Sequence, residues 1–112
     1  LNDCDKITLS QKDYRDVAIQ DGSIVYADPP YKKTRCTGYK GKFDYDAFER
    51  WLSDALFMVV VSGYECPAEC VEVSQISKQP IIGTKNLYGS GVERLFVQER
   101  FAEQYKRMMG RF

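Results

Sequence analysis

The spacing of hydrophobic residues changes along the chain and predicts a different element in each stretch. Apolar runs at residues 23–27 and 57–61 predict two buried strands, and the β-branched second run is typical of a parallel sheet. Between them, apolar residues recur at helical spacing and predict an amphipathic helix over residues 44–55, capped by Asp44 or Asp46. Residues 23–62 therefore form a predicted βαβ unit, which indicates an α/β fold.

Shorter patterns flank this unit. Ile7 and Leu9 would lie on one face of a short strand over residues 6–9. Residues 71–76 and 95–97 predict two further strands, joined by a polar loop as an antiparallel pair at a sheet edge. Residues 99–109 predict a closing helix whose apolar face carries Phe101, Tyr105, Met108 and Met109. We therefore expect one domain over residues 1–112, with a mixed sheet and an antiparallel edge.

Charge and hydropathy reduce the range of functions that the chain could have. The 16 basic and 16 acidic side chains balance, which argues against a strongly basic nucleic-acid binder. The longest apolar run, residues 55–61, is too short to span a bilayer, so we expect no membrane partner. Basic residues nevertheless gather, without any acid, in the polar loop over residues 32–42. A local basic loop of this kind suits contact with phosphate; its members are Lys32, Lys33, Arg35, Lys40 and Lys42.

The chain contains four cysteines and no histidine. Without histidine, it contains neither Ser-His nor Cys-His nucleophilic machinery. Cys66 and Cys70 have the spacing of half a zinc site, but Cys4 and Cys36 are scattered and no histidine can complete it. We expect reduced thiols and no metal site, and a structural zinc site is the alternative.

Candidate chemistry lies directly after the first buried strand, at Asp28-Pro29-Pro30-Tyr31. In open α/β sheets, ligands bind beyond the carboxyl ends of the strands. The Asp28 carboxylate and a proline-fixed carbonyl offer two hydrogen-bond acceptors, and Tyr31 offers a flat face for stacking. These groups are suited to an exocyclic amine on an aromatic ring. Two acceptors on its N–H groups favour a pyramidal nitrogen, which frees the lone pair to attack an electrophilic methyl group.

Asp-Pro-Pro-Tyr after a hydrophobic strand resembles motif IV of the amino methyltransferases that use S-adenosylmethionine. The form with Asp is most similar to the N6-adenine DNA methyltransferases of the Dam-like D12 class. Three weaker similarities follow in the expected order, so that the resemblance covers roughly residues 7–98. They are Asp13-Tyr14, the strand and turn Val59 to Tyr64, and the late segment from Gly89 to Val97.

The resemblance implies a Rossmann-like fold, S-adenosylmethionine as cofactor and double-stranded DNA as partner. Asp28 and a proline carbonyl, that of Pro29, would accept hydrogen bonds from the target amine, and Tyr31 would stack on a flipped-out adenine. Asp13 or Tyr14 would lie near the adenine of the cofactor, with Asp28 also at the cofactor site. The basic residues of 32–42 would contact the DNA backbone. A bacterial or phage protein of the cytoplasm is implied.

The chain also departs from the family pattern, because no Gly-rich turn for the cofactor precedes Asp28. The sequence therefore resembles the carboxyl-terminal half of a methyltransferase domain with an incomplete cofactor site. On this interpretation, the isolated chain would not transfer methyl groups. Such a half sheet would expose an edge, which predicts self-association. Two other functions stay open: a guanine-N2 methyltransferase of ribosomal RNA, and an inactive remnant or nucleic-acid-binding module.

Overall fold

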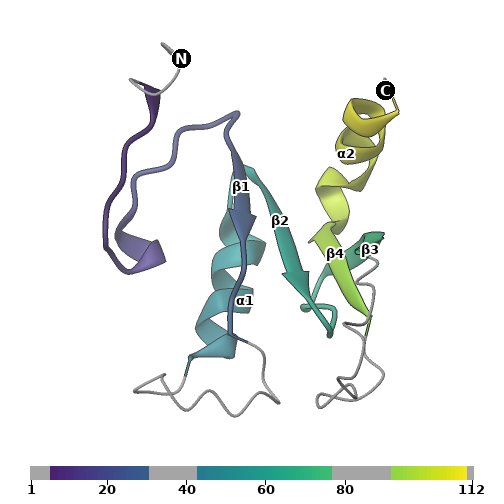
Figure 1. Ribbon diagram of the computed structural model, residues 1–112, viewed down its shortest axis with the longest axis horizontal. Coiled ribbons are helices and arrows are strands. Elements are labelled where there is room, and N and C mark those ends of the chain that lie inside the picture. The colour runs from purple at the N-terminus through teal and green to yellow at the C-terminus, as the bar shows by residue number, and fades with distance from the viewer. Residues whose placement is uncertain (1–5, 31–42, 77–91, 111–112) are drawn as a thin grey trace, which may run out of the picture.

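The computed structural model describes residues 6–30, 43–76 and 92–110. Its core is one four-stranded sheet with the strand order β1-β2-β4-β3 (Figure 1). β1 and β2 are parallel, whereas β4 is antiparallel to both β2 and β3. The predicted mixed sheet and its antiparallel edge are therefore confirmed. The strands are β1 (Ile24–Ala27), β2 (Met58–Gly63), β3 (Cys70–Ile76) and β4 (Glu93–Gln98).

Helix α1 (Tyr45–Asp54) connects the two parallel strands and covers one face of the sheet. Its buried residues Phe48 and Leu52 pack with Val59 and Val61, which point to this face of β2. Every residue of β2 is buried, because the opposite face of the strand is covered as well. The predicted βαβ unit is thus confirmed in order and strand direction, and β2 is buried as predicted. The prediction that the first strand is also buried was wrong, since Ile24 and Tyr26 of β1 are 51% and 62% exposed. β1 lies at the edge of the described sheet, and these two side chains join neither of its described core clusters.

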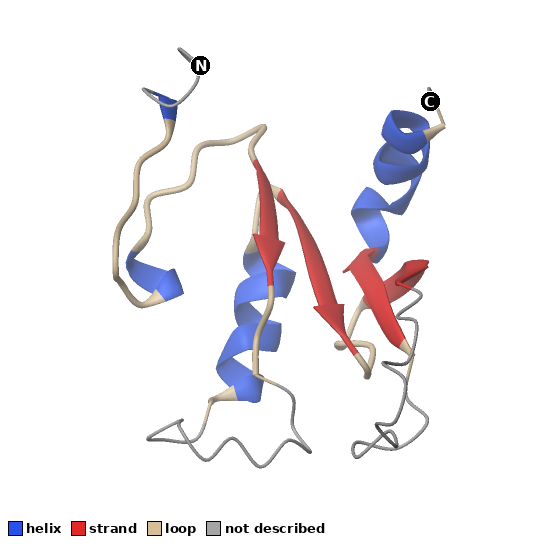
Figure 2. Cartoon of the chain, in the orientation of Figure 1, coloured by secondary structure: helices blue, strands red, loops and turns tan. Residues whose placement is uncertain are grey.

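The other face of the sheet is covered by the chain after β4. A 3-10 turn, η3 (Glu99–Phe101), leads into α2 (Ala102–Met109), which Figure 2 shows on the opposite side of the molecule from α1. Phe101 and Tyr105 pack against Met58 and Val60 of β2. The prediction for the end of this helix was wrong, since 36% of Met108 and 53% of Met109 are exposed. The helix continues beyond the sheet, so its last turn has no described strand to cover.

The amino-terminal segment before β1 forms an extended arm rather than the strand predicted over residues 6–9. Ile7 and Leu9 are 66% and 91% exposed, and no described strand pairs with them. The arm contains a 3-10 turn, η2 (Tyr14–Asp16). A short apolar alternation permits a strand but does not supply the neighbouring edge that a strand needs for its hydrogen bonds.

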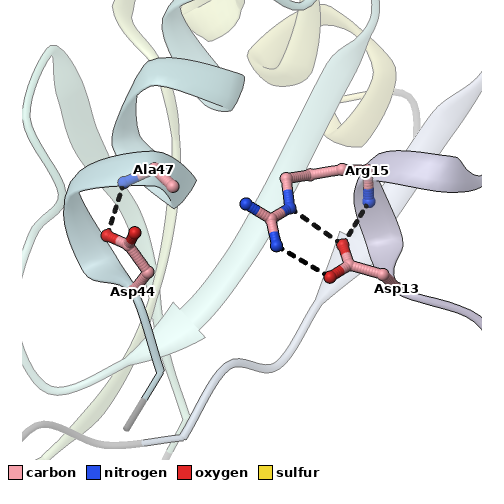
Figure 3. Close-up of polar contacts among 4 residues, drawn as sticks. All are labelled: Asp13, Arg15, Asp44 and Ala47. Carbon is pink, nitrogen blue, oxygen red and sulfur yellow. Dashed lines mark hydrogen bonds and ion pairs between the residues drawn. The ribbon is translucent and has the colours of Figure 1, made fainter.

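Helix α1 begins at Asp44, which resolves the choice between the two predicted caps. The Asp44 side chain accepts a hydrogen bond of 3.0 Å from the backbone N–H of Ala47 (Figure 3). We expect Asp44→Ala to lower the free energy of unfolding by about 1 kcal/mol, because that N–H loses its partner. Urea denaturation should measure this loss. Asp46→Ala is the control and should lower the free energy of unfolding by only a few tenths of a kcal/mol. Equal losses in the two variants would contradict the assignment of Asp44 as the helix cap.

Gln98, at the end of β4, is a polar residue inside the core, with only 1% of its surface exposed. Its side-chain oxygen accepts a 2.8 Å hydrogen bond from the N–H of Val59. Its side-chain nitrogen donates to the carbonyl of Phe57 at 3.0 Å and to that of Leu52 at 3.4 Å. One amide thus joins β4 to the end of α1 and the start of β2, and fixes where β2 begins.

Candidate active site

Asp28 and the two prolines follow β1 at its carboxyl end, as the sequence predicts. Asp28 is exposed, and Pro29 and Pro30 are half-buried. The parallel register pairs Ala27, the last residue of β1, with Val61, so that Asp28, directly after the strand, lies beside Ser62. The hydroxyl of Ser62, which is completely buried, donates a 2.9 Å hydrogen bond to Oδ1 of Asp28. One oxygen of the Asp28 carboxylate is therefore anchored to the sheet, while the residue itself reaches solvent.

The backbone after Asp28 is held from the other side by α1. The hydroxyl of Tyr45, in the first turn of that helix, donates a hydrogen bond to the carbonyl of Pro30. Among the described residues, no donor engages the carbonyl of Pro29. Among the described residues, the acceptors at this end of β1 without a described donor include the Pro29 carbonyl and Oδ2 of Asp28.

Asp13 and Tyr14, the pair proposed for the cofactor, lie in the arm. The Asp13 carboxylate accepts a 3.0 Å bond from Nε of Arg15 and a 2.8 Å bond from its Nη2 (Figure 3). It also accepts a 2.9 Å bond from the Arg15 N–H and so caps η2. The Arg15 hydrogen bonds lower the pKa of Asp13 to about 2, which keeps this carboxylate charged at neutral pH.

Tyr14 attaches the arm to α1 through aromatic contacts. Its ring lies 5.1 Å from that of Trp51 and 5.7 Å from that of Phe48, both in edge-on arrangements. Burial raises the pKa of the Tyr14 hydroxyl. No described hydrogen bond joins Asp13 or Tyr14 to Asp28. The structure therefore ties Asp28 to Ser62 and the Asp13-Tyr14 pair to α1.

The model of one protein family, described as the D12 class N6 adenine-specific DNA methyltransferase, matches residues 1–102. This match includes the Asp28 segment, both parallel strands and β4. The chain belongs to this family. No curated protein and no solved structure matches the chain.

Several residues for which the sequence predicts a role at the site lie outside the described residues. They are Tyr31, the basic residues Lys32, Lys33, Arg35, Lys40 and Lys42, and the late segment Gly89 to Gly91. Two neighbours of the motif gain importance instead. Ser62 lies within the strand and turn Val59 to Tyr64 of the family resemblance, whereas the sequence predicts no role for Tyr45. The register of two parallel strands would have placed Ser62 beside Asp28, whereas nothing in the spacing of Tyr45 indicated its contact with Pro30.

The described part of the structure has an open pocket of about 260 Å³ on the side away from Asp28. Trp51, Leu56 and Phe57 supply apolar walls, and Asp21 precedes β1. Because Asp21 and Phe57 lie just before the two parallel strands, the pocket is at their amino ends. It therefore does not contribute to the acceptor site beyond the carboxyl end of β1.

Of the cysteine pair, Cys66 lies in the loop between β2 and β3, and Cys70 is the first residue of β3. The Cys66 thiol donates a 3.1 Å hydrogen bond to the Cys70 carbonyl, and both thiols are free. Burial raises the pKa of Cys70 to about 12, so this thiol stays protonated at neutral pH. Within the described part of the chain, no cluster of three or more His, Cys, Asp or Glu is arranged to hold a metal ion.

Family membership implies S-adenosylmethionine, and the described residues fit only part of such a site. Asp28 presents a carboxylate that reaches solvent beyond β1. Asp13, in contrast, directs both oxygens to Arg15, and the Tyr14 ring is occupied by aromatic neighbours. The described residues therefore fit the amine that receives the methyl group better than they fit the cofactor.

Proposed function

We propose that this chain serves methyl transfer from S-adenosylmethionine to N6 of adenine in double-stranded DNA. The observation that carries the proposal is the pair of available acceptors, Oδ2 of Asp28 and the Pro29 carbonyl, beyond the carboxyl end of β1. Membership of a family of N6 adenine-specific DNA methyltransferases supports this assignment.

The chain's part in the reaction follows from the properties of an arylamine. Its lone pair is delocalised into the ring, so the free amine is a poor nucleophile. Asp28 and the Pro29 carbonyl each accept one N–H of the target amine, which favours a pyramidal nitrogen with its lone pair available. S-adenosylmethionine, when bound, supplies the electrophilic methyl group. The nitrogen would gain the methyl carbon as the sulfur–methyl bond breaks and the cofactor leaves as S-adenosylhomocysteine. The nitrogen releases one proton, for which the Asp28 carboxylate is the nearest anionic acceptor in the proposed arrangement.

Other residues complete the proposal. Tyr31 stacks on an adenine flipped out of the duplex, because the reacting nitrogen is inaccessible within the base stack. Asp13 or Tyr14 lies near the adenine of the cofactor. Contacts with the phosphate backbone come from the basic segment, whose members are Lys32, Lys33, Arg35, Lys40 and Lys42.

The experiment that tests this function is transfer of labelled methyl from S-adenosylmethionine to duplex DNA, ribosomal RNA and protein in parallel reactions. It is run on this chain and on the full-length gene product. Label on DNA is the expected result. Label on RNA alone would favour the guanine-N2 alternative. No label on any acceptor, without cofactor binding, would favour an inactive remnant or binding module.

We also propose a cytoplasmic location. None of the helices in the described ranges is long and apolar enough to cross a membrane.

We further propose self-association through the edge of β1. β1 ends the described sheet, and its side chains Ile24 and Tyr26 are 51% and 62% exposed. We expect sedimentation velocity to show a dimer that grows with concentration, and that Tyr26→Lys weakens. A monomer at all concentrations would contradict the proposal.

A further inference from the structure

We propose that Ser62 and Tyr45 are positioning residues that select the two acceptors used in methyl transfer. This inference rests on the proposed function and deepens it. Ser62 holds Oδ1 of Asp28, and Tyr45 holds the carbonyl of Pro30. The acceptors without a described partner are then Oδ2 of Asp28 and the carbonyl of Pro29, which lie on adjacent residues.

The position of Ser62 makes its hydrogen bond a rigid constraint. β2 is buried along its whole length, and Ser62 has no exposed surface. A buried hydroxyl needs a partner, because an unpaired polar group inside a protein is costly. Asp28 Oδ1 at 2.9 Å supplies that partner, and the bond in turn limits rotation of the carboxylate. An exposed aspartate would otherwise lose rotamer freedom only when it bound the amine.

Tyr45 acts on the backbone of the same segment. It lies in the first turn of α1, directly after the Asp44 cap, and its helix is fixed to the sheet through Phe48 and Leu52. Its hydroxyl therefore engages the Pro30 carbonyl from a fixed position. Because each proline restricts its own φ angle, holding one carbonyl also limits where the preceding carbonyl points. The Pro29 carbonyl is thereby aimed without a hydrogen bond of its own from any described residue.

The test compares single variants of the full-length gene product, with genomic DNA from a strain lacking adenine methylation as substrate. We expect Ser62→Ala and Tyr45→Phe each to lower kcat about ten-fold, the effect of one lost hydrogen bond in the transition state. KM for DNA and for the cofactor should change less than about two-fold, since neither hydroxyl touches a ligand. Ser62→Thr keeps the hydroxyl and should recover most of the rate.

Matched controls separate positioning from folding. Ser74→Ala makes the same change at an exposed site on β3, and Tyr105→Phe removes a hydroxyl from a half-buried tyrosine on α2. Both should keep the unaltered kcat, and all variants should be folded by circular dichroism at the assay temperature. Unaltered kcat in Ser62→Ala and Tyr45→Phe would overturn this inference alone, as would equal losses in the controls. No transfer to DNA by the unaltered protein would overturn the proposed function, and this inference with it.

Discussion

Asp28→Ala is expected to reduce methyl transfer to DNA by about a thousand-fold in the full-length gene product. The substitution removes the charged acceptor that Ser62 positions at the carboxyl end of β1. Loss of a single preorganised polar group at a reacting centre costs about 10²–10³ in rate, and the loss of a charge places Asp28 at the upper end. Initial rates with labelled S-adenosylmethionine measure the effect.

Asp21→Ala is the matched control for this experiment. It removes an exposed carboxylate from the opposite end of β1, beside the pocket, and should leave the rate within about two-fold. Stability should also be compared, because Asp28→Ala leaves the buried Ser62 hydroxyl without its described acceptor. If the folded Asp28→Ala protein kept its rate, the target amine would not be bound by this carboxylate.

Of the variants proposed for this chain, Gln98→Leu is expected to lose the most stability, about 2–4 kcal/mol in the free energy of unfolding. Leucine has a similar volume, so the change leaves little cavity. However, the N–H of Val59 and the carbonyl of Phe57 would each lose a hydrogen-bond partner next to the core. Each buried group left unsatisfied costs about 1–3 kcal/mol. Urea denaturation with a two-state fit measures the difference.

Gln104→Leu provides the control, because Gln104 is exposed on α2 and makes no described hydrogen bond. Its stability should stay within about 0.5 kcal/mol of the unaltered chain. Gln98→Glu is a second comparison: it keeps an acceptor for Val59 but removes the donor to Phe57. A loss below 1 kcal/mol in Gln98→Leu would show that this amide does not hold β4 against the start of β2.

The centre of the fold could be predicted from sequence because its physical signals are local. The helical spacing around Phe48 and Leu52, and the continuous apolar run of β2, each have one simple packing solution. The short alternation at Ile7 and Leu9 did not form a strand, since pairing depends on an edge elsewhere in the fold. Met108 likewise follows the helical period but lies beyond the sheet that it would need to cover.

The positions of Asp28 and the two prolines after β1 could be predicted from the sequence, whereas their contacts with Ser62 and Tyr45 could not. The place of Asp28 follows from the hydrophobic strand before it and the two prolines after it, which put it beyond the carboxyl end of β1. Its partner Ser62 lies 34 residues further along, and their contact depends on strand register rather than on any local pattern. Tyr45 contacts Pro30 only because α1 begins where Asp44 caps it. Long-range contacts of this kind follow from the assembled sheet.

The most direct test of the central claim is the identity of the methylated nucleoside. Duplex DNA from a strain lacking adenine methylation is incubated with the full-length gene product and S-adenosylmethionine, digested to nucleosides and analysed by mass spectrometry. We predict N6-methyladenine with the unaltered protein and its loss with Asp28→Ala. Methylated DNA without N6-methyladenine, or equal N6-methyladenine from both proteins, would contradict the role assigned to Asp28 and the Pro29 carbonyl.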